Sequence, residues 1–211
     1  MKFSSIFCFS RRNIPLLILL IFSINLQAEE DLAKKLANPI SSLISVPIKA
    51  SYNENFGVND NGHVWSINVQ PVIPVSISDN WNMISRTILP IIDQTDVPMT
   101  GLDQAGIGDI QQSLFFSPKQ PTSNGIVWGV GPVFLFDSAS KDVLGAEKWG
   151  MGPTAVMLKQ QGPWTYGFLG NHIQSFAGNH NRADISATFM QPFLAYVTST
   201  KTTFSLNTES T

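Results

Sequence analysis

Apolar and polar residues alternate along most of this chain. From Trp65 to Ile77 every second residue is apolar or proline, while Ser66, Asn68 and Gln70 lie between them. Side chains two residues apart share one face of a strand, so this run predicts a strand longer than the usual five or so residues. Nine such segments follow one another, at residues 46–54, 63–77, 81–92, 107–117, 126–136, 148–160, 164–176, 184–198 and 202–211.

The connectors between these segments alternate in length. Tight turns at 78–80, 161–163 and 199–201, and a somewhat longer connector at 118–125, alternate with long polar loops at 55–62, 93–106, 137–147 and 177–183. Short turns at one end and long loops at the other are typical of outer-membrane barrels. No segment after residue 45 has a helical period. The predicted fold class is therefore all-β, an antiparallel up-and-down transmembrane β-barrel over residues 46–211.

The first 28 residues have the layout of a cleavable signal peptide. Three basic residues precede an apolar run at 16–22, and the small residue Ala28 is followed by an acidic triplet. This order of segments directs export, and the apolar run is too short to span a bilayer as a helix. We therefore expect an exported protein whose mature chain begins at residue 29.

Residues 29–45 predict a short amphipathic helix before the first strand. Leu32, Leu36 and Ile40 keep helical spacing, although Pro39 interrupts it. A helix with one apolar face needs a partner for that face. We expect it to lie on a surface or to plug part of the barrel.

The composition narrows the class of protein. Only 13% of residues are charged, about half the share in ordinary soluble domains, and a lipid-facing row of side chains explains this because charges there are costly. Removing Lys2, Arg11 and Arg12 with the signal peptide takes three of 13 basic residues and none of the 15 acidic ones, which leaves a net charge of −5. This balance excludes the basic surface of a nucleic-acid binder.

Chemistry that depends on cysteine, on a metal or on a cofactor is not expected. The only cysteine, Cys8, leaves with the signal peptide, so the mature chain has no disulfide, thiolate ligand or cysteine nucleophile. The three histidines are scattered, and the acidic residues collect in the predicted outer loops. The expected partners are outer-membrane lipid and a small-molecule solute.

Tryptophans mark both ends of the predicted strands. Trp81, Trp128 and Trp164 begin strands next to short connectors, whereas Trp65 and Trp149 lie near long ones. Indole rings favour membrane–water interfaces because they combine an apolar body with one polar N–H group. The alternative is that these rings belong to a sandwich core, although a core usually places them in mid-strand.

Polar residues on the opposite face are candidates for a lumen that binds or passes a ligand. Arg86 is the only arginine in any predicted strand, and an isolated charge there must point at water or at a carboxylate. We expect it to act on a ligand or on ion selectivity, with Asp109 as the candidate partner; the alternative is that it only braces the lumen. The lumen candidates are Asn68, Gln70, Asn82, Arg86, Asp109, Gln111 and Glu209.

The fifth segment complicates this picture. Its inner row, from Val127 to Leu135, is small or apolar, whereas a wide water-filled porin has a polar interior. The pattern favours a narrow, partly apolar lumen and a hydrophobic solute. It also fits the core of a soluble periplasmic ligand-binding β-sandwich, which stays an open alternative.

Enzyme function is not expected. A hydrolase built into the barrel wall would need a serine beside a base that a third group orients, and no Gly-x-Ser-x-Gly motif occurs. A barrel-embedded lipid hydrolase is therefore the weaker alternative. The repeated strings WGVGP at 128–132 and WGMGP at 149–153 are not phosphate loops, and we expect them to mark close backbone approach or strand bending.

Several strings resemble a family of bacterial outer-membrane β-barrels labelled as transporters or named for the MetA pathway of phenol degradation. The strings are NVQPVIPVSISDNWNMISRTILPII, GIGDIQQSLFFSPK, WGVGPVFLF, LGAEKWGMGPTAV, GPWTYGFLGNH and MQPFLAYVT. The resemblance covers residues 31–211. It implies an outer-membrane barrel for passage or binding of small, often hydrophobic molecules, and it brings no catalytic or binding residues.

The strand count predicts an incomplete barrel. Nine is odd, whereas single-chain bacterial barrels have an even number of strands, and the resembling family continues for several strands more. We therefore expect C-terminal strands beyond residue 211 and no closed ring from the nine segments alone.

Overall fold

Strands account for most of the computed structural model, which describes residues 32–57, 59–200 and 202–210. The predicted signal peptide, residues 1–28, lies outside the described residues. The strands are β1 (Ile48–Phe56), β2 (Gly62–Val69), β3 (Val72–Ser76), β4 (Trp81–Thr95), β5 (Gln104–Ile107), β6 (Gln111–Pro118), β7 (Ile126–Leu135), β8 (Lys148–Gln161), β9 (Trp164–Gly178), β10 (Ser186–Val197) and β11 (Thr203–Asn207), with a 3-10 turn η1 (Asp142–Leu144). No helix in these ranges is long and apolar enough to cross a membrane.

All the strands belong to one antiparallel sheet in the order β1-β2-β4-β6-β7-β8-β9-β10-β11. The nine positions correspond to the nine predicted segments, so the predicted all-β, up-and-down antiparallel topology is confirmed. Two of the nine positions are each filled by two short strands. Strands β2 and β3 both pair with one edge of β4, and strands β5 and β6 both pair with its other edge. The first break occurs around Pro71, where the backbone of Gln70 and Val72 bonds instead to Pro47 and Ser45.

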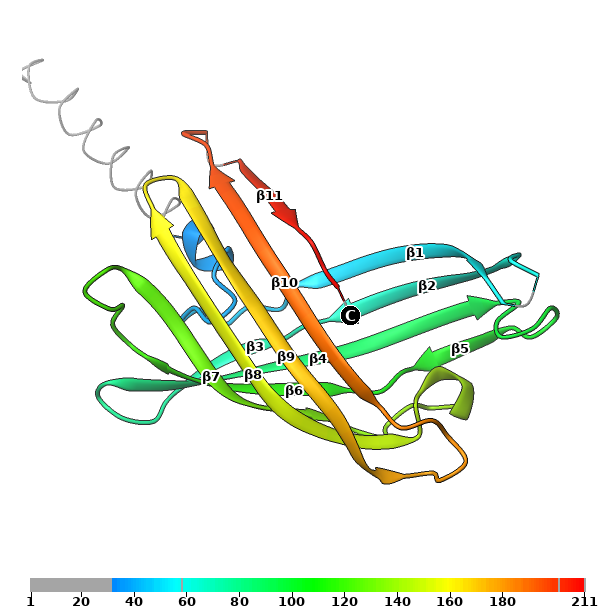
Figure 1. Ribbon diagram of the computed structural model, residues 1–211. Helices are drawn as coiled ribbons and strands as arrows, with labels where there is room; N and C mark the ends of the chain where they lie inside the picture. The colour runs from blue at the N-terminus through cyan, green and yellow to red at the C-terminus, as the bar shows by residue number, and fades with distance from the viewer. Residues whose placement is uncertain (1–31, 58, 201, 211) are drawn as a thin grey trace, which may run out of the picture.

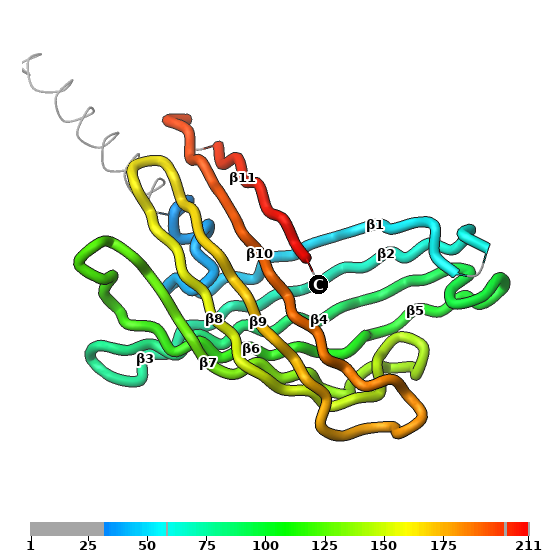
Figure 2. The backbone as a smooth tube through the Cα atoms, in the orientation of Figure 1, coloured from blue at the N-terminus to red at the C-terminus, as the bar shows by residue number. Residues whose placement is uncertain are grey.

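The sheet curls into an incomplete barrel (Figure 1). The short connectors lie toward the left of this view, and the long loops lie toward the right. The two edge strands, β1 and β11, run in the same direction because every pair between them is antiparallel. They are not paired as strands, yet the chain after β11 comes back to β1 (Figure 2), where Lys49 Nζ lies 2.7 Å from Glu209 Oε1.

The concave face of the sheet carries an apolar core. Phe115 and Ile84 are almost completely buried in it, together with Val72, Val156, Leu158 and Leu169. Alternate residues of the same strands point outward, as Val130 and Met157 show. Period two thus separates an inner and an outer row, as the alternation predicts.

The glycine repeats allow close backbone approach, as expected. A Cβ atom at Gly131 would overlap the carbonyl oxygen of Leu114, and one at Gly152 would overlap that of His172. Both oxygens belong to the neighbouring strand. A side chain at either position would force the two strands apart.

The N-terminal segment enters the barrel. In the described residues its helix covers 32–36, so the helix expected over 29–45 stops well before residue 45. The helix ends before Pro39, because the residue ahead of a proline avoids helical geometry, and Asn38 Oδ1 instead accepts a hydrogen bond from Ile40 N at 2.9 Å. Gln160 Nε2 donates to the carbonyl oxygen of Lys34 at 2.8 Å and holds the helix to β8.

Ile40 anchors this segment in the core. It is 5% exposed and belongs to the same apolar cluster as Phe115 and Ile84. A Cβ at Gly129 would lie 3.3 Å from Ile40 Cδ1, so the missing side chain at Gly129 makes room for Ile40. The helix therefore partly plugs the barrel, which is one of the two placements expected from the sequence.

We predict that Ile40→Ala destabilises the fold, because it leaves a cavity in this cluster. The expected loss is about 2–5 kcal/mol in the free energy of unfolding, measured by urea titration in detergent micelles. Ile44→Ala is the matched control, since Ile44 is 67% exposed, and its effect should stay within about 0.5 kcal/mol. Equal losses in the two variants would contradict the anchoring role of Ile40.

Candidate lumen site

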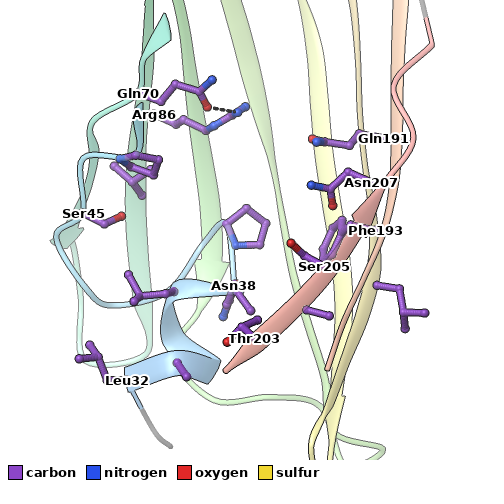
Figure 3. Close-up of a pocket in the computed structure, with 18 residues that line it drawn as sticks. Leu32, Asn38, Ser45, Gln70, Arg86, Gln191, Phe193, Thr203, Ser205 and Asn207 are labelled. Atoms are coloured by element: carbon purple, nitrogen blue, oxygen red, sulfur yellow. Dashed lines mark hydrogen bonds between the residues drawn. The ribbon is translucent and has the colours of Figure 1, made fainter. Parts of the chain in front are cut away.

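Two cavities lie against the concave face of the sheet. The larger has a volume of about 750 Å³ and lies between the N-terminal segment and strands β10 and β11 (Figure 3). Leu32, Leu36, Val72 and Phe193 provide apolar walls. This cavity lies at the end of the barrel that carries the short connectors, because the helix enters there.

The second cavity, of about 420 Å³, has more charged side chains in its lining. Asn68, Gln111, Asn171, Lys49 and Glu209 contribute to its lining. The residues common to both linings are Pro47, Gln70, Arg86, Gln191 and Asn207. A polar group of side chains therefore stands where the two cavities meet.

Arg86 lies at this junction. Its Nη2 atom donates to Gln70 Oε1 at 2.8 Å, and Figure 3 shows the two side chains side by side above the helix. Strand β4 aims Arg86 inward, because Arg86 is two residues from the buried Ile84. Gln70 reaches it from the break between β2 and β3.

Glu209 is the acid of the second cavity, and it already has partners. Lys49 Nζ donates to both of its carboxylate oxygens at 2.7 and 2.8 Å, and Gln191 Nε2 donates to Oε1 at 3.2 Å. These contacts join the first strand to the end of the chain. Glu209 is thus a bridge between the two edges of the sheet as well as a lumen residue.

Five of the seven lumen candidates meet at this site. Asn68, Gln70, Arg86, Gln111 and Glu209 line the second cavity, and Gln70 and Arg86 line both. Asn82 is on the inward face of β4, four residues from Arg86, but it is in neither lining. Asp109 is in neither lining either.

The expected partnership of Arg86 and Asp109 is wrong. Asp109 precedes β6 and turns toward the long loop between β7 and β8, where its carboxylate accepts three backbone N–H groups, from Ser138 at 3.2 Å, Ala139 at 3.1 Å and Ala146 at 2.6 Å. A carboxylate with three such donors is satisfied locally. Parity along the strand does not reveal this, because the chain at residues 108–110 leaves the sheet.

Sequence reasoning missed Gln191 and Phe193, which line the larger cavity from β10. The alternating pattern of the segment 184–198 contained the necessary information, because every second residue of that segment could have been assigned to the lumen. It also missed Lys49, whose role depends on a residue 160 positions away. No local pattern predicts such a contact.

We predict that Asp109→Ala releases the loop at residues 136–147. Hydrogen bonds to a charged group contribute about 1.5–3 kcal/mol, so trypsin should cleave after the exposed Lys141 on the order of ten to a hundred times faster. Asp137→Ala is the matched control, because Asp137 is exposed in the same loop. Equal cleavage rates in both variants would show that Asp109 does not hold the loop.

Two ion pairs connect a second long loop, at 179–185, to the region of residues 145–148. Lys148 Nζ lies 2.9 Å from Asp184 Oδ1, and the Lys148 side chain is only 6% exposed. Arg182 contacts Glu147 Oε1 at 3.1 Å and donates to the carbonyl oxygen of Gly145 at 2.6 Å. The loop at 179–185 is thus fixed to the loop that Asp109 holds.

Hydrogen bonding to Lys148, and its charge, hold the pKa of Asp184 below its ordinary value of 3.8, and Ser175 adds a smaller effect. A lowered pKa means that this contact stabilises the fold fully above about pH 3.8, and that its contribution is lost as the pH falls through the lowered value. We predict that Lys148→Met raises the pKa of Asp184 toward 3.8 in an NMR titration of the carboxyl carbon. Ser175→Ala should raise it less, and the reverse order would contradict the dominance of Lys148.

Within the described ranges, no group of three or more His, Cys, Asp and Glu side chains is placed to hold a metal ion. His172 Nδ1 lies 2.9 Å from Thr188 Oγ1, on alternate positions from the inward residues Asn171 and Ile173. The polar groups at the junction of the cavities are amides, one guanidinium and an ion pair. This set of groups can orient a solute by hydrogen bonding.

No family model matches the sequence, and no curated protein matches it. Among solved structures, the chain is similar to the COG4313 outer membrane channel from Pseudomonas putida F1, with a TM-score of 0.52 and 15% identity. The match covers 73% of this chain and 63% of that one. This likeness supports the fold, an incomplete antiparallel β-barrel.

Proposed function

We propose that this chain forms most of a bacterial outer-membrane β-barrel that passes small hydrophobic or aromatic solutes without catalysing a reaction. The observation that carries the proposal is the partly apolar cavity of about 750 Å³ inside a curled antiparallel sheet. Its volume falls in the range of small-molecule sites, roughly 300–1,000 Å³. The structural similarity to an outer membrane channel supports the same function.

The outer face of the sheet supports a membrane location. Large apolar side chains are exposed along it on most strands, including Ile67, Ile73, Val75, Ile91, Val130, Met157, Phe168 and Leu194. Soluble monomers rarely expose continuous apolar patches of this kind. Lipid would cover them at no cost, and the predicted signal peptide would deliver the chain to the envelope.

The tryptophans fit the same location. Trp81 and Trp128 pack edge to face with ring centroids 5.8 Å apart, and Trp164 lies 4.7 Å from Tyr196, all near the short connectors. At the other end Trp65 packs on Tyr52, and Trp149 packs on Phe136. The proposal assigns these two groups to the two membrane–water interfaces.

Closure of the barrel is part of the proposal. Strands β1 and β11 each have one edge without a strand partner, and a bilayer offers no water to satisfy such groups. Among the described residues the Lys49–Glu209 ion pair spans the gap between these two edges, and the proposal keeps them as neighbours in the membrane.

Fractionation of cells that express an epitope-tagged chain tests the location. We expect the chain in the outer-membrane fraction, with a tag inserted at residues 98–101 accessible from outside intact cells. Recovery in the soluble periplasmic fraction would instead favour a ligand-binding β-sandwich. Lipid hydrolysis by a barrel that passes no solute would favour the hydrolase.

We predict that Ser205→Trp blocks passage, because Ser205 lines the larger cavity and an indole there would fill much of it. Uptake of a hydrophobic naphthylamine dye by intact cells should fall several-fold, toward the rate of cells without the protein. Phe204→Trp is the matched control on the same strand, since Phe204 is 65% exposed and outside that lining. Unchanged uptake in a Ser205→Trp barrel that is still folded would exclude this cavity from the route.

A further inference from the structure

We propose that the solute is an amphipathic carboxylate, an aromatic or short aliphatic acid whose anionic group binds Arg86 while its apolar body occupies the larger cavity. This inference rests on the proposed function and adds the chemical class of the solute. It depends on the surroundings of a single cation at the junction of the two cavities.

Arg86 makes no ion pair among the described residues, although the charge of Glu209 acts on it electrostatically. Its hydrogen bond is to the neutral amide of Gln70. The acid of the same cavity, Glu209, is instead bound by Lys49 and Gln191. The three charged groups in this lining, Lys49, Arg86 and Glu209, therefore carry a net charge of +1.

A bracing role would use the guanidinium differently. A guanidinium has five N–H donors in a planar fork that matches the two oxygens of a carboxylate. Within the part of the chain that the structure describes, only Nη2 has a partner, and this partner, Gln70, fixes the orientation of the fork. Contact with an uncharged amide orients the group without neutralising it, so the charge stays available for a ligand.

The position of Arg86 selects for an amphipathic ligand. Arg86 and Gln70 line both cavities, whereas the apolar side chains of Leu32, Leu36 and Phe193 line only the larger one. A carboxylate at Arg86 would leave its apolar body free to extend between the helix and β10. A neutral hydrocarbon would gain nothing at Arg86, and a small inorganic anion would leave the apolar walls unfilled.

Benzoate and benzamide provide a matched pair of probes, because they have nearly the same shape and differ in charge. We would measure their dissociation constants for the full chain in zwitterionic micelles by isothermal titration calorimetry. For the unmodified chain we expect benzoate to bind at least tenfold tighter than benzamide, with the difference shrinking in high salt. Arg86→Gln should abolish the difference, and Arg86→Lys should retain part of it.

Lys119→Gln is the matched control for the loss of one positive charge. Lys119 is on the turn after β6, where its Nζ donates to Ser76 Oγ at 2.7 Å, and it lines neither cavity. This variant should keep the preference for benzoate. Binding of benzamide by the Arg86→Gln variant shows that this variant is folded. If the Arg86→Gln variant binds neither probe, the Arg86→Lys variant provides the test, and it should retain part of the preference for benzoate.

The outcomes separate this inference from the proposed function. Equal binding of benzoate and benzamide by the unmodified chain overturns the carboxylate class and leaves a hydrophobic solute in place. A preference for benzoate that survives in a folded Arg86→Gln variant overturns the role of Arg86. Failure of both probes to bind, with dye uptake unaffected by Ser205→Trp, removes the cavity from the proposed function and the carboxylate site with it.

Discussion

Backbone hydrogen bonding between consecutive antiparallel strands is the interaction on which the rest of the structure depends. Strand β4 is the clearest example of this hydrogen bonding, because it pairs with β2 and β3 along one edge and with β5 and β6 along the other. Where the ladder breaks near Pro71, the N-terminal segment provides the missing partners through Ser45 and Pro47. The segment that enters the barrel therefore also completes the sheet.

Curling of the sheet creates an interior with two parts, one lined mainly by apolar side chains and one lined mainly by polar side chains. At the end with the short connectors, Ile40 and the core around Phe115 make the interior apolar. Farther along, amides and the Lys49–Glu209 pair make it polar. Arg86 lies between these two parts of the interior, and its side chain lines both cavities. This placement makes it the residue most able to distinguish one solute from another.

The long loops form a second connected unit at the opposite end. Asp109 binds the backbone of residues 138–146, and Arg182 and Lys148 connect that segment to the loop before β10. The charged residues in these contacts are Asp109, Glu147, Lys148, Arg182 and Asp184, which lie in the loops or at a strand end. Acidic residues thus hold loops in place, while the lumen charge that could act on a ligand comes from a base.

The alternating pattern alone determined the nine strand positions, their antiparallel order and the inward direction of Asn68, Gln70 and Arg86. A period of two fixes the face of each residue wherever the strand is regular, so these predictions needed no tertiary information. They were less successful where regularity ends. The helix stops at residue 36 because of Pro39, and Asp109 leaves the sheet to bind a loop, so neither its face nor its partner followed from parity.

Only the tertiary structure decided which inward residues meet. Curling brings Lys49 of the first strand beside Glu209 near the end of the chain, so this acid forms its ion pair with Lys49 and not with Arg86. The same curvature places Phe193 opposite the N-terminal helix and so creates the apolar cavity. The curvature of a sheet comes from the summed twist of all its strands, and no single stretch of sequence encodes it.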